Sequence, residues 1–440
     1  MWFSSAPLWR RFPRRWRPIA GAAALWIGLV FELWPAADKI ANRLPPPRLP
    51  SQADLESKIE ISLKAPDFDY LGGDLVLLPS SGPVRLEVEL VSRAPEEFGL
   101  EVERESLRWG CDGGVLLMSE PRSRSVLNSW LPPDRSAVST VYATYEAYYR
   151  SRGRNGESFR IHAAKAAARF FLSPTRPEQL QNGVIDGFVI GKYPDPFDAG
   201  VFKRFETEES QWPALYPWHY TAPNGFYKVT RDNVDRHISK NFTLRFFATD
   251  FPWRSEGFPQ YVALDQRLVR KLEDLLDLVV RHGLARGGFT PIYGFRRPAY
   301  NLGSIERNGD YNLKAPFSMH QYGRAVDLII DEDGDLVMDD LNGDGFHDIA
   351  DAAELIKCVN VLDYRYREAG SDLVGGAGLY ARHDFVERPV QSPYVHIDVR
   401  GFLGQGGVLI RWPMRWPSGA VIVWRDLYPD WFVRQPAAVP

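Results

Sequence analysis

Cysteine and net charge are both scarce in this chain. Its 440 residues include two cysteines, Cys111 and Cys358, and the formal net charge is −3 at pH 7. Two cysteines far apart in sequence do not make a disulfide scaffold, and the sequence leaves open whether they pair. A net charge this close to zero is not the electrostatic footprint of a nucleic-acid-binding protein, so we expect no nucleic-acid partner. No internal repeat is visible either.

Aromatic residues, by contrast, are abundant. The chain has 14 Trp, 19 Tyr and 25 Phe, with 45% hydrophobic and 25% charged residues overall. This balance is ordinary for a folded protein, and the length suggests two or three domains. Aromatic residues in such numbers can line a carbohydrate-contacting surface or fill a β-rich core, and we favour the core.

The first 35 residues are interpreted as a membrane-targeting segment. Five arginines in WRRFPRRWRP precede the apolar run IAGAAALWIGLVFELW. Positive charge followed by about 15 to 20 apolar residues is typical of an export signal or signal anchor that keeps its arginines in the cytoplasm. We favour an uncleaved anchor in the cytoplasmic membrane (residues 1–35), with a cleaved signal peptide as the alternative. Both interpretations place the rest of the chain in the periplasm or outside the cell.

The next regions differ in composition. A proline-rich linker covers residues 36–52, and short alternating runs such as VRLEVELVS recur in residues 53–190. Such runs, separated by Gly, Pro and Ser, predict a β-rich, sandwich-like domain whose role the sequence does not indicate. Two of its segments, YATYEAYYRSR and FRIHAAKAAARFFL, fit a helix or a strand, and His162 in the second is interpreted as a packed histidine. A connecting segment rich in Gly, Pro and aromatics occupies residues 191–240.

The C-terminal half carries helical patterns. Gln260 to His282 has leucines at spacings of three and four, which predicts an amphipathic helix that ends before Gly283. A second helix is expected near Ile349 to Glu368. Because strand patterns accompany these helices, we expect a fold of the α+β class over residues 241–416. A Trp-containing tail of unassigned role follows at residues 417–440.

Two short motifs place polar residues in apolar surroundings. SMHQYGRAVDLIID puts His320 seven residues before Asp327, in a stretch that is otherwise nearly all apolar. A buried carboxylate is costly unless a cation or several donors meet it. SPYVHIDVRG alternates strictly, so His396 lies on the polar face of a strand. Two histidines and one carboxylate with an open fourth position form a catalytic zinc set. The alternative is a structural hydrogen bond between His320 and Asp327.

These motifs resemble those of the zinc D-Ala-D-Ala metallopeptidase family of bacterial cell-wall enzymes. SMHQYGRAVDL is similar to the family pattern S-x-H-x-x-G-x-A-x-D, and YVHIDVRG to the strand of its last histidine. GGAGLY resembles the G-G-x-G-x-Y segment of the murein endopeptidase branch. YGFRRPAYN resembles the S-G-Y-R-x-x-x-x-N element, with Tyr293 in place of serine. The resemblance spans roughly residues 240 to 416 and leaves the N-terminal half unassigned.

The resemblance implies both a fold and a function. It implies a peptidase domain at residues 241–416, with a small antiparallel sheet and flanking helices. His320, Asp327 and His396 would be zinc ligands, and Arg296 would stabilise the carbonyl oxygen in the transition state. The implied reaction is zinc-dependent hydrolysis of peptide bonds in peptidoglycan stem peptides or cross-links, of the D,D-carboxypeptidase or the endopeptidase type. Peptidoglycan peptides are then the expected partner. The alternative is a non-catalytic protein that keeps the fold and the metal but binds or scaffolds peptidoglycan.

The general base departs from the family pattern. The acidic residue that many members place three positions before the last histidine is here Pro393, and Tyr394 stands where others carry a second histidine. Asp398 shares a strand face with His396, so it is our candidate for the base. Its competing role is to orient a ligand or to pair with Arg400. Other candidates for the base are His383 and Glu387.

DLNGDGFHDIAD has the spacing of an EF-hand calcium loop. Oxygen-bearing side chains fall at positions 1, 3, 5, 9 and 12, a glycine falls at position 6, and the exiting helix AAELIKCVNVL follows. No clear entering helix precedes it, so it resembles a dockerin-type half-hand. We predict calcium as a second cofactor, with an acidic solvated turn as the alternative. The neighbouring DEDGD is predicted to be a hairpin turn. The predicted calcium ligands are Asp340, Asn342, Asp344, the Phe346 carbonyl, Asp348 and Asp351.

Overall fold

The computed structural model describes most of the chain between residues 49 and 401. Among the helices of this described part, none is long and apolar enough to cross a membrane. The predicted anchor at residues 1–35 and nearly all of the predicted tail at residues 417–440 lie outside the described residues. The described residues are 49–79, 82–117, 126–152, 157–197, 217–248, 257–308, 316–380, 383–385, 388–390, 392–401, 411–412 and 429.

The chain forms two compact units, and each combines segments that are distant in sequence. The second unit contains residues on both sides of residue 190, and the domain bounds expected from the sequence stay predictions. All residues of the candidate site described below belong to the second unit. The first unit consists of the described residues within Met1–Ile59, Ser92–Glu105 and Ala147–Ala163, and the second of the described residues within Glu60–Val91, Ser106–Glu146 and Ala164–Pro440.

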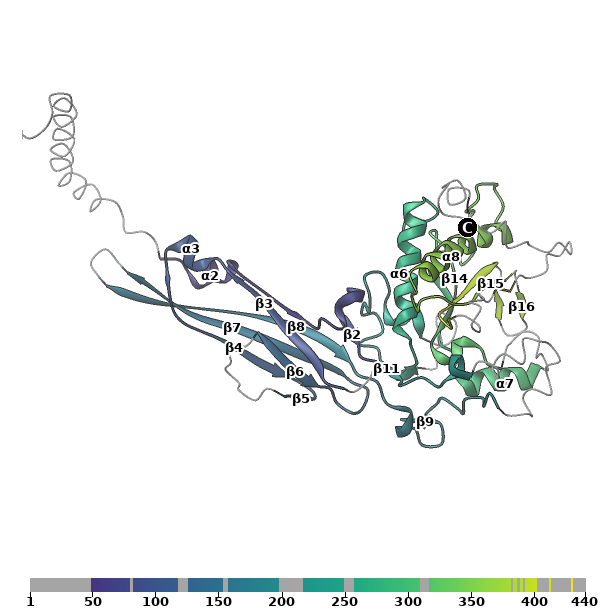
Figure 1. The fold of residues 1–440 in the computed structure, drawn as a ribbon, viewed down its shortest axis with the longest axis horizontal. Helices are drawn as coiled ribbons and strands as arrows, with labels where there is room; N and C mark the ends of the chain where they lie inside the picture. Colours follow the sequence, from purple (N-terminus) through teal and green to yellow (C-terminus); the bar gives the residue numbers. More distant parts are fainter. Residues whose placement is uncertain are drawn as a thin grey trace, which may run out of the picture. The chain divides into compact units, whose positions relative to one another are not determined.

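Two four-stranded sheets account for most of residues 59–172 (Figure 1). Their strand orders are β1-β3-β6-β5 and β2-β8-β7-β4. The rings of Trp130 and Phe171, both fully buried, lie 5.0 Å apart and join the two sheets. The β-rich character predicted here is confirmed, and the two ambiguous segments are the strands β7 and β8. The strands are β1 (Ile59–Lys64), β2 (Leu75–Leu77), β3 (Val84–Ser92), β4 (Glu101–Cys111), β5 (Val115–Leu116), β6 (Leu127–Leu131), β7 (Val138–Arg152) and β8 (Ser158–Leu172), with the helices α2 (Gln52–Ser57) and α3 (Ala94–Phe98).

The amphipathic helix begins later than predicted. It is α6 (Gln266–Arg281), whereas β12 (Gln260–Val262) precedes it and pairs with β11 (Tyr227–Val229). The helix begins there because the Asp265 carboxylate accepts a hydrogen bond from the Arg267 amide and caps the first turn. The second predicted helix is confirmed as α8 (Ile349–Glu368). The short elements before α6 are η3 (Asp69–Leu71), η4 (Pro177–Gln179), β9 (Val184–Ile185), β10 (Phe188–Val189), η6 (Pro217–Tyr220) and η7 (Leu244–Phe247).

A five-stranded sheet in the order β13-β14-β18-β15-β19 carries the candidate site. Its first four strands are antiparallel, and β19 is parallel to β15. The register places Tyr293, Asp327, His396 and Gly378 opposite one another on successive strands, so they share one face. The elements of this region are β13 (Thr290–Tyr293), α7 (Pro298–Asn308), η8 (Met319–Tyr322), β14 (Ala325–Ile329), β15 (Ala377–Tyr380), β16 (His383–Phe385), β17 (Arg388–Val390), β18 (Tyr394–Asp398) and β19 (Arg411–Trp412).

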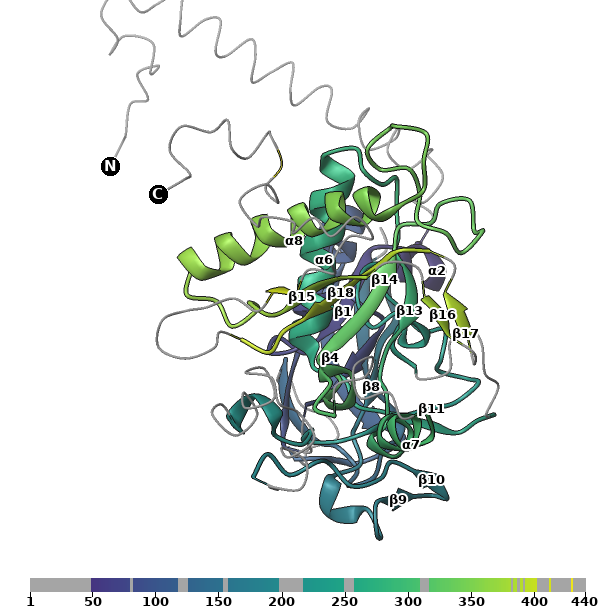
Figure 2. The ribbon, with the colours of Figure 1, turned by 90° about the vertical axis from the view of Figure 1, so that its right-hand side faces the viewer.

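Helices cover the other face of this sheet. α8 contacts β15 and β18, and α6 contacts α8 in turn; Figure 2 shows α8 lying along the sheet. Val326, Leu328, Val395 and Ile397, which alternate with the site residues, belong to the same buried core as the leucines of α6. Mixed helices and small sheets make the fold α+β, as predicted. Asp327 and His396 therefore project from strands whose other face packs against helices.

Candidate metal centre

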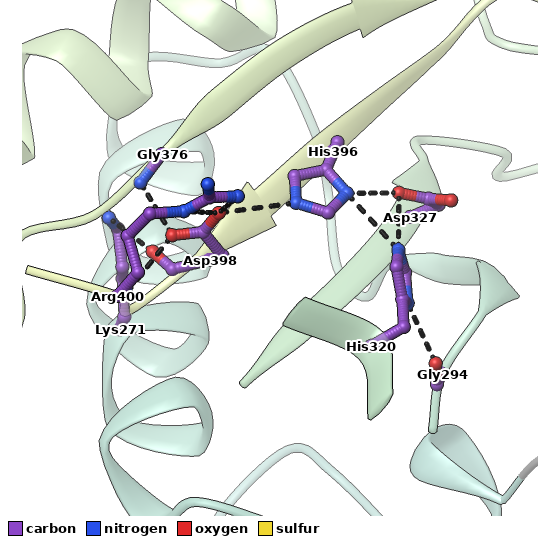
Figure 3. Close-up of polar contacts among 8 residues, drawn as sticks. All are labelled: Lys271, Gly294, His320, Asp327, Gly376, His396, Asp398 and Arg400. Atoms are coloured by element: carbon purple, nitrogen blue, oxygen red, sulfur yellow. Dashed lines mark hydrogen bonds and ion pairs between the residues drawn. The ribbon is translucent and has the colours of Figure 1, made fainter. Parts of the chain in front are cut away.

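Three side chains of metal-ligand type meet on the face of the sheet opposite α8. His320 comes from η8, Asp327 from the middle of β14 and His396 from β18 (Figure 3). His396 Nδ1 lies 2.7 Å from Asp327 Oδ1 and 3.1 Å from His320 Nε2, which is itself 3.1 Å from the same oxygen. All three residues are at most 5% exposed. The structure thus brings together the residues that the sequence suggested for zinc.

A glycine allows His320 to sit beside β14. η8 ends at Gly323, whose φ of 65° lies in the left-handed region. A Cβ at this position would lie 2.3 Å from the Ala263 carbonyl oxygen. Glycine meets both conditions because it has no Cβ. The chain then passes directly into β14, which carries Asp327.

Outer hydrogen bonds determine which nitrogen of each imidazole faces inward. His320 Nδ1 lies 2.8 Å from the Gly294 carbonyl oxygen, which can only accept, so this nitrogen carries the proton. His396 Nε2 lies 3.3 Å from an Asp398 carboxylate oxygen, so it can carry the proton of the ring while Nδ1, which is 2.7 Å from Asp327 Oδ1, is left to bind a cation. In these two tautomers, His320 Nε2 and His396 Nδ1 are acceptors. Both face a third acceptor, Asp327 Oδ1.

Three acceptors that face one another require a positive centre. A proton on one imidazole would serve only the contacts of that ring, whereas a divalent cation would satisfy all three atoms. In a tetrahedral zinc site the ligand atoms are about 3.3 Å apart, because each bond is about 2.0–2.1 Å long. The observed separations of 2.7 to 3.1 Å are slightly shorter. The donor set and its spacing therefore fit zinc after a small outward movement.

The electrostatics of the cluster also favour a cation. Burial alone would raise the pKa of Asp327, but the adjacent His320 and His396 hold this pKa far below its usual range. Burial lowers the pKa of His320 and keeps that ring neutral. Burial acts in the same direction on His396, but its hydrogen bonds to Asp327 and Asp398 overcome it and raise the pKa. The cluster thus contains an ionised carboxylate and attracts positive charge.

Arg296 and three tyrosines lie near the cluster. The Arg296 amide donates to the His320 carbonyl oxygen at 3.1 Å, and the guanidinium lies 5.3 Å from the centre of the Tyr293 ring. Tyr380 and Tyr394 stack with ring centres 4.9 Å apart. After burial, the charge of Arg296 is among the causes that lower the pKa of His320. Arg296 is therefore close enough to act on charge that develops at the cluster.

Asp398 does not occupy the position of a general base. It is fully buried and lies on the far side of His396 from the other two ligand-type residues (Figure 3). Its carboxylate accepts hydrogen bonds from the Gly376 amide at 2.6 Å and from Arg400 Nε at 2.7 Å. A base must reach the proton that it takes, and here the imidazole stands between. The prediction of Asp398 as the base does not fit this geometry, whereas its competing role of orienting His396 does.

The second half of the predicted calcium loop is used to begin α8. Asp351, predicted as position 12, is fully buried, and its carboxylate accepts from the amides of Leu341, Asn342 and Asp348. The Asp348 side chain accepts from the Ala350 amide and caps the helix. Both carboxylates serve backbone donors, as the carboxylate of Asp340 also does, so these contacts do not decide between the two uses, and Asp348 and Asp351 as calcium ligands stay predictions.

The first half of this loop is repeated nine residues earlier. Asp340 accepts from the amides at positions 343, 344 and 345, and Asp331 accepts from those at positions 334, 335 and 336. In the described part of the chain, two groups of at least three acidic, His or Cys residues have ligand atoms within 4.8 Å: the cluster above, and Asp331 with Asp333 and Asp335. Residues 330–376, all described, contain no strand, so the hairpin predicted at DEDGD is wrong.

Two candidates for the base cannot be placed. Glu387 lies outside the described residues, and His383 is described only as part of β16. Sequence analysis also missed Lys271 and Asp363, a fully buried ion pair. The sequence did contain a signal that Lys271 is buried. It stands three residues after Leu268 and therefore on the apolar stripe of α6.

Comparison with protein-family models, curated proteins and solved structures finds no match to this chain. The arrangement of its own residues is therefore the basis for the function proposed next.

Proposed function

We propose that this chain is a zinc-dependent peptidase that hydrolyses peptide bonds in peptidoglycan stem peptides or cross-links. The observation that carries the proposal is the meeting of three acceptor atoms, from His320, Asp327 and His396, in a buried cluster. The substrate class comes from the motif resemblance described above. In this proposal residues 241–416 are the peptidase domain, and residues 53–190 form a sandwich-like domain.

The residues around the cluster have distinct tasks in this proposal. Zinc held there would lower the pKa of its water to about 7 and polarise a peptide carbonyl. The Gly294 carbonyl oxygen and Asp398 hold the two imidazoles in the required tautomers. Arg296 offers a fixed guanidinium to the carbonyl oxygen that gains negative charge during the reaction. Asp398 acts by orienting His396 and not by taking a proton.

Turnover of purified muropeptides tests the proposal. The full-length protein is incubated with them in the presence of zinc and after removal of metal by a chelator, and the products are identified by mass. Release of a terminal D-alanine would indicate a carboxypeptidase, and cleavage of a cross-link an endopeptidase. Binding of muropeptides without any zinc-dependent product would contradict the proposal and favour the non-catalytic alternative.

We also propose that the loop beginning at Asp340 binds calcium through its first half. Asp340, Asn342 and Asp344 keep the spacing of calcium ligands, and Gly345 has the φ of 83° that the sharp turn requires. Extracellular modules bind calcium at about 10⁻⁴ to 10⁻³ M. At a free concentration about 100 times the dissociation constant, bound calcium would stabilise the fold by about 2.7 kcal/mol.

A calcium-dependent melting temperature is therefore expected. Adding about 10 mM calcium, well above this affinity range, should raise the melting temperature, and chelation should reverse the rise. Asp344→Asn should reduce the response, because one charged ligand is lost. Magnesium at the same concentration serves as the ionic-strength control. A melting temperature that is indifferent to calcium and chelator would count against the loop as a site.

The proposed function requires that the chain beyond the basic N-terminal segment be exported. A reporter that is active only after export, fused after Pro50, is expected to be active in cells. The arginine-flanked apolar run motivates this expectation. A matched fusion in which the arginines of WRRFPRRWRP are replaced by glutamate should lose part of that activity. Activity confined to a cytoplasm-only reporter at the same position would overturn the localisation.

A further inference from the structure

We propose that Lys271 is a positioning residue for the metal ligand His396, acting through Asp398, with Asp363 as its counter-ion. The inference rests on the proposed metal centre and extends it to residues on the covered side of the sheet. Figure 3 shows Lys271, Asp398 and His396 as successive members of one set of polar contacts.

Asp398 is held from several directions. Its carboxylate accepts from the amides of Gly376 and Arg400 and from the Arg400 guanidinium, and its own amide donates to the Gly376 carbonyl oxygen. The same carboxylate faces His396 Nε2 at 3.3 Å. Asp398 is the last residue of β18, where the strand pairing with β14 ends. A contact that holds the Asp398 backbone therefore also fixes the position of the carboxylate that faces the His396 imidazole.

Lys271 approaches this backbone from α6. Its side chain is 1% exposed, and its Nζ atom lies 2.7 Å from Asp363 Oδ1 in α8 and 3.1 Å from the Asp398 carbonyl oxygen. One ammonium group thus connects two helices to the end of β18. Gly375 leaves space for this contact, because a Cβ there would lie 1.9 Å from the same carbonyl oxygen. The first two glycines of GGAGLY, Gly375 and Gly376, therefore pack against Asp398.

Stability alone does not account for the buried ion pair. Removing an ammonium and a carboxylate from water is costly, and apolar pairs of similar volume are often equally or more stabilising. An apolar pair lacks a donor, so it cannot supply the contact from Lys271 to the Asp398 carbonyl oxygen. That contact is directed at the residue that holds His396 Nε2, which is why we assign it a positioning role.

The charges of this network leave one carboxylate for the metal. Lys271 pairs with Asp363, and Arg400 lies 2.5 Å from Asp398. Within this hydrogen-bonded network, to which the nearby Arg296 side chain does not belong, two cations against the three carboxylates of Asp327, Asp363 and Asp398 give a net charge of −1 when the imidazoles are neutral. The uncompensated charge is on Asp327, which faces the two histidines. Asp398 is neutralised by Arg400 and does not compete for the cation.

The double variant Lys271→Met/Asp363→Leu tests the proposal. It removes both charges at nearly constant volume, so the fold is expected to persist. Zinc affinity, measured by chelator competition, should fall about tenfold, the lower end of the effect of losing an outer partner of a metal ligand. The visible spectrum of the cobalt-substituted protein should shift as well, because His396 is held differently.

Tyr366→Phe is the matched control. The Tyr366 hydroxyl donates to Asp274 at 2.6 Å and also joins α8 to α6, but neither residue is among the hydrogen-bond partners of Asp398 described above. This variant should keep the zinc affinity and the cobalt spectrum of the intact protein. If the double variant fails to fold, Lys271→Gln/Asp363→Asn replaces it, since it keeps hydrogen-bonding groups but shortens the reach to Asp398, and it is judged by the same two readouts.

The outcomes separate this inference from the proposed reaction. A folded variant with unchanged zinc affinity and cobalt spectrum would overturn the positioning role of Lys271 and leave the peptidase proposal untouched. Intact protein that binds zinc tightly but turns over no muropeptide would remove the proposed reaction and leave the positioning role standing. An equal loss of zinc affinity in Tyr366→Phe would also overturn the inference. Weaker packing between α6 and α8 would then explain the affinity losses of both variants.

Discussion

Replacing His396 with alanine is expected to weaken zinc binding by more than about 100-fold and to abolish zinc-dependent hydrolysis. Loss of an outer hydrogen-bond partner of a metal ligand costs about 10- to 100-fold in affinity. This change removes a ligand atom itself, the Nδ1 that lies 2.7 Å from Asp327 Oδ1. The remaining histidine and carboxylate form a two-ligand site, which is weaker than a three-ligand one. Metal content after dialysis and affinity by chelator competition measure the effect.

His162→Ala is the control for this variant. His162 lies in the first compact unit, where its ring is 4.7 Å from the ring of Tyr148. The control should retain one zinc per chain and the turnover of the intact protein. Full zinc content in His396→Ala would show that the ligand set is wrong, and zinc-independent product release by that variant would remove the zinc mechanism.

The sequence predicts the strands and side chains of the site better than the hydrogen bonds between them. Strict alternation in SPYVHIDVRG correctly puts Val395 and Ile397 on the core face and His396 on the other. Periodicity cannot tell on which side of an imidazole a neighbouring carboxylate lies. Here Arg400 and the Gly376 amide draw Asp398 away from the cluster. Only the folded chain contains that information, because Gly376 comes from another part of the sequence.

Local capping explains two further differences. Asp351 has the spacing of a twelfth calcium-loop residue, but it is also the third residue of α8, where an acidic side chain can accept from the amides that begin a helix. In the structure its carboxylate accepts from the amides of Leu341, Asn342 and Asp348. Asp265 similarly starts α6 after β12, although the leucine period gave no reason to break the pattern at that residue. The spacing of a motif does not show whether a carboxylate binds calcium or accepts from the amides that begin a helix.

Asp398→Asn is expected to weaken zinc binding by about 10- to 100-fold and to leave turnover at saturating zinc within about tenfold of the intact protein. The amide keeps the shape of the side chain but is a poorer partner for the His396 Nε2–H group. The affinity loss follows because the imidazole is then held less firmly in the tautomer that turns Nδ1 inward. A general base, by contrast, would lose at least about 100-fold in turnover with zinc retained.

The same variant should also destabilise the fold. Burial would raise the pKa of Asp398, but the charge of Arg400 holds this pKa well below its usual range. The ionised form therefore contributes stability that is present at neutral pH and is lost as the pH falls through the folded-state pKa. Neutralising the carboxylate leaves the buried Arg400 uncompensated, which costs about 3–5 kcal/mol. Unfolding in denaturant at pH 7 measures this cost.

A second variant separates the charge effect from the ligand effect. Asp398→Asn/Arg400→Gln removes both charges, so it should regain part of the lost stability, because no unpaired guanidinium remains buried. It should not regain zinc affinity, because His396 still lacks its carboxylate partner. Recovery of zinc affinity in the double variant would mean that charge imbalance, and not orientation of the imidazole, caused the loss. A loss of 100-fold or more in turnover at saturating zinc, with the affinity unchanged, would restore Asp398 as the general base, and His396 would then have to move aside during the reaction.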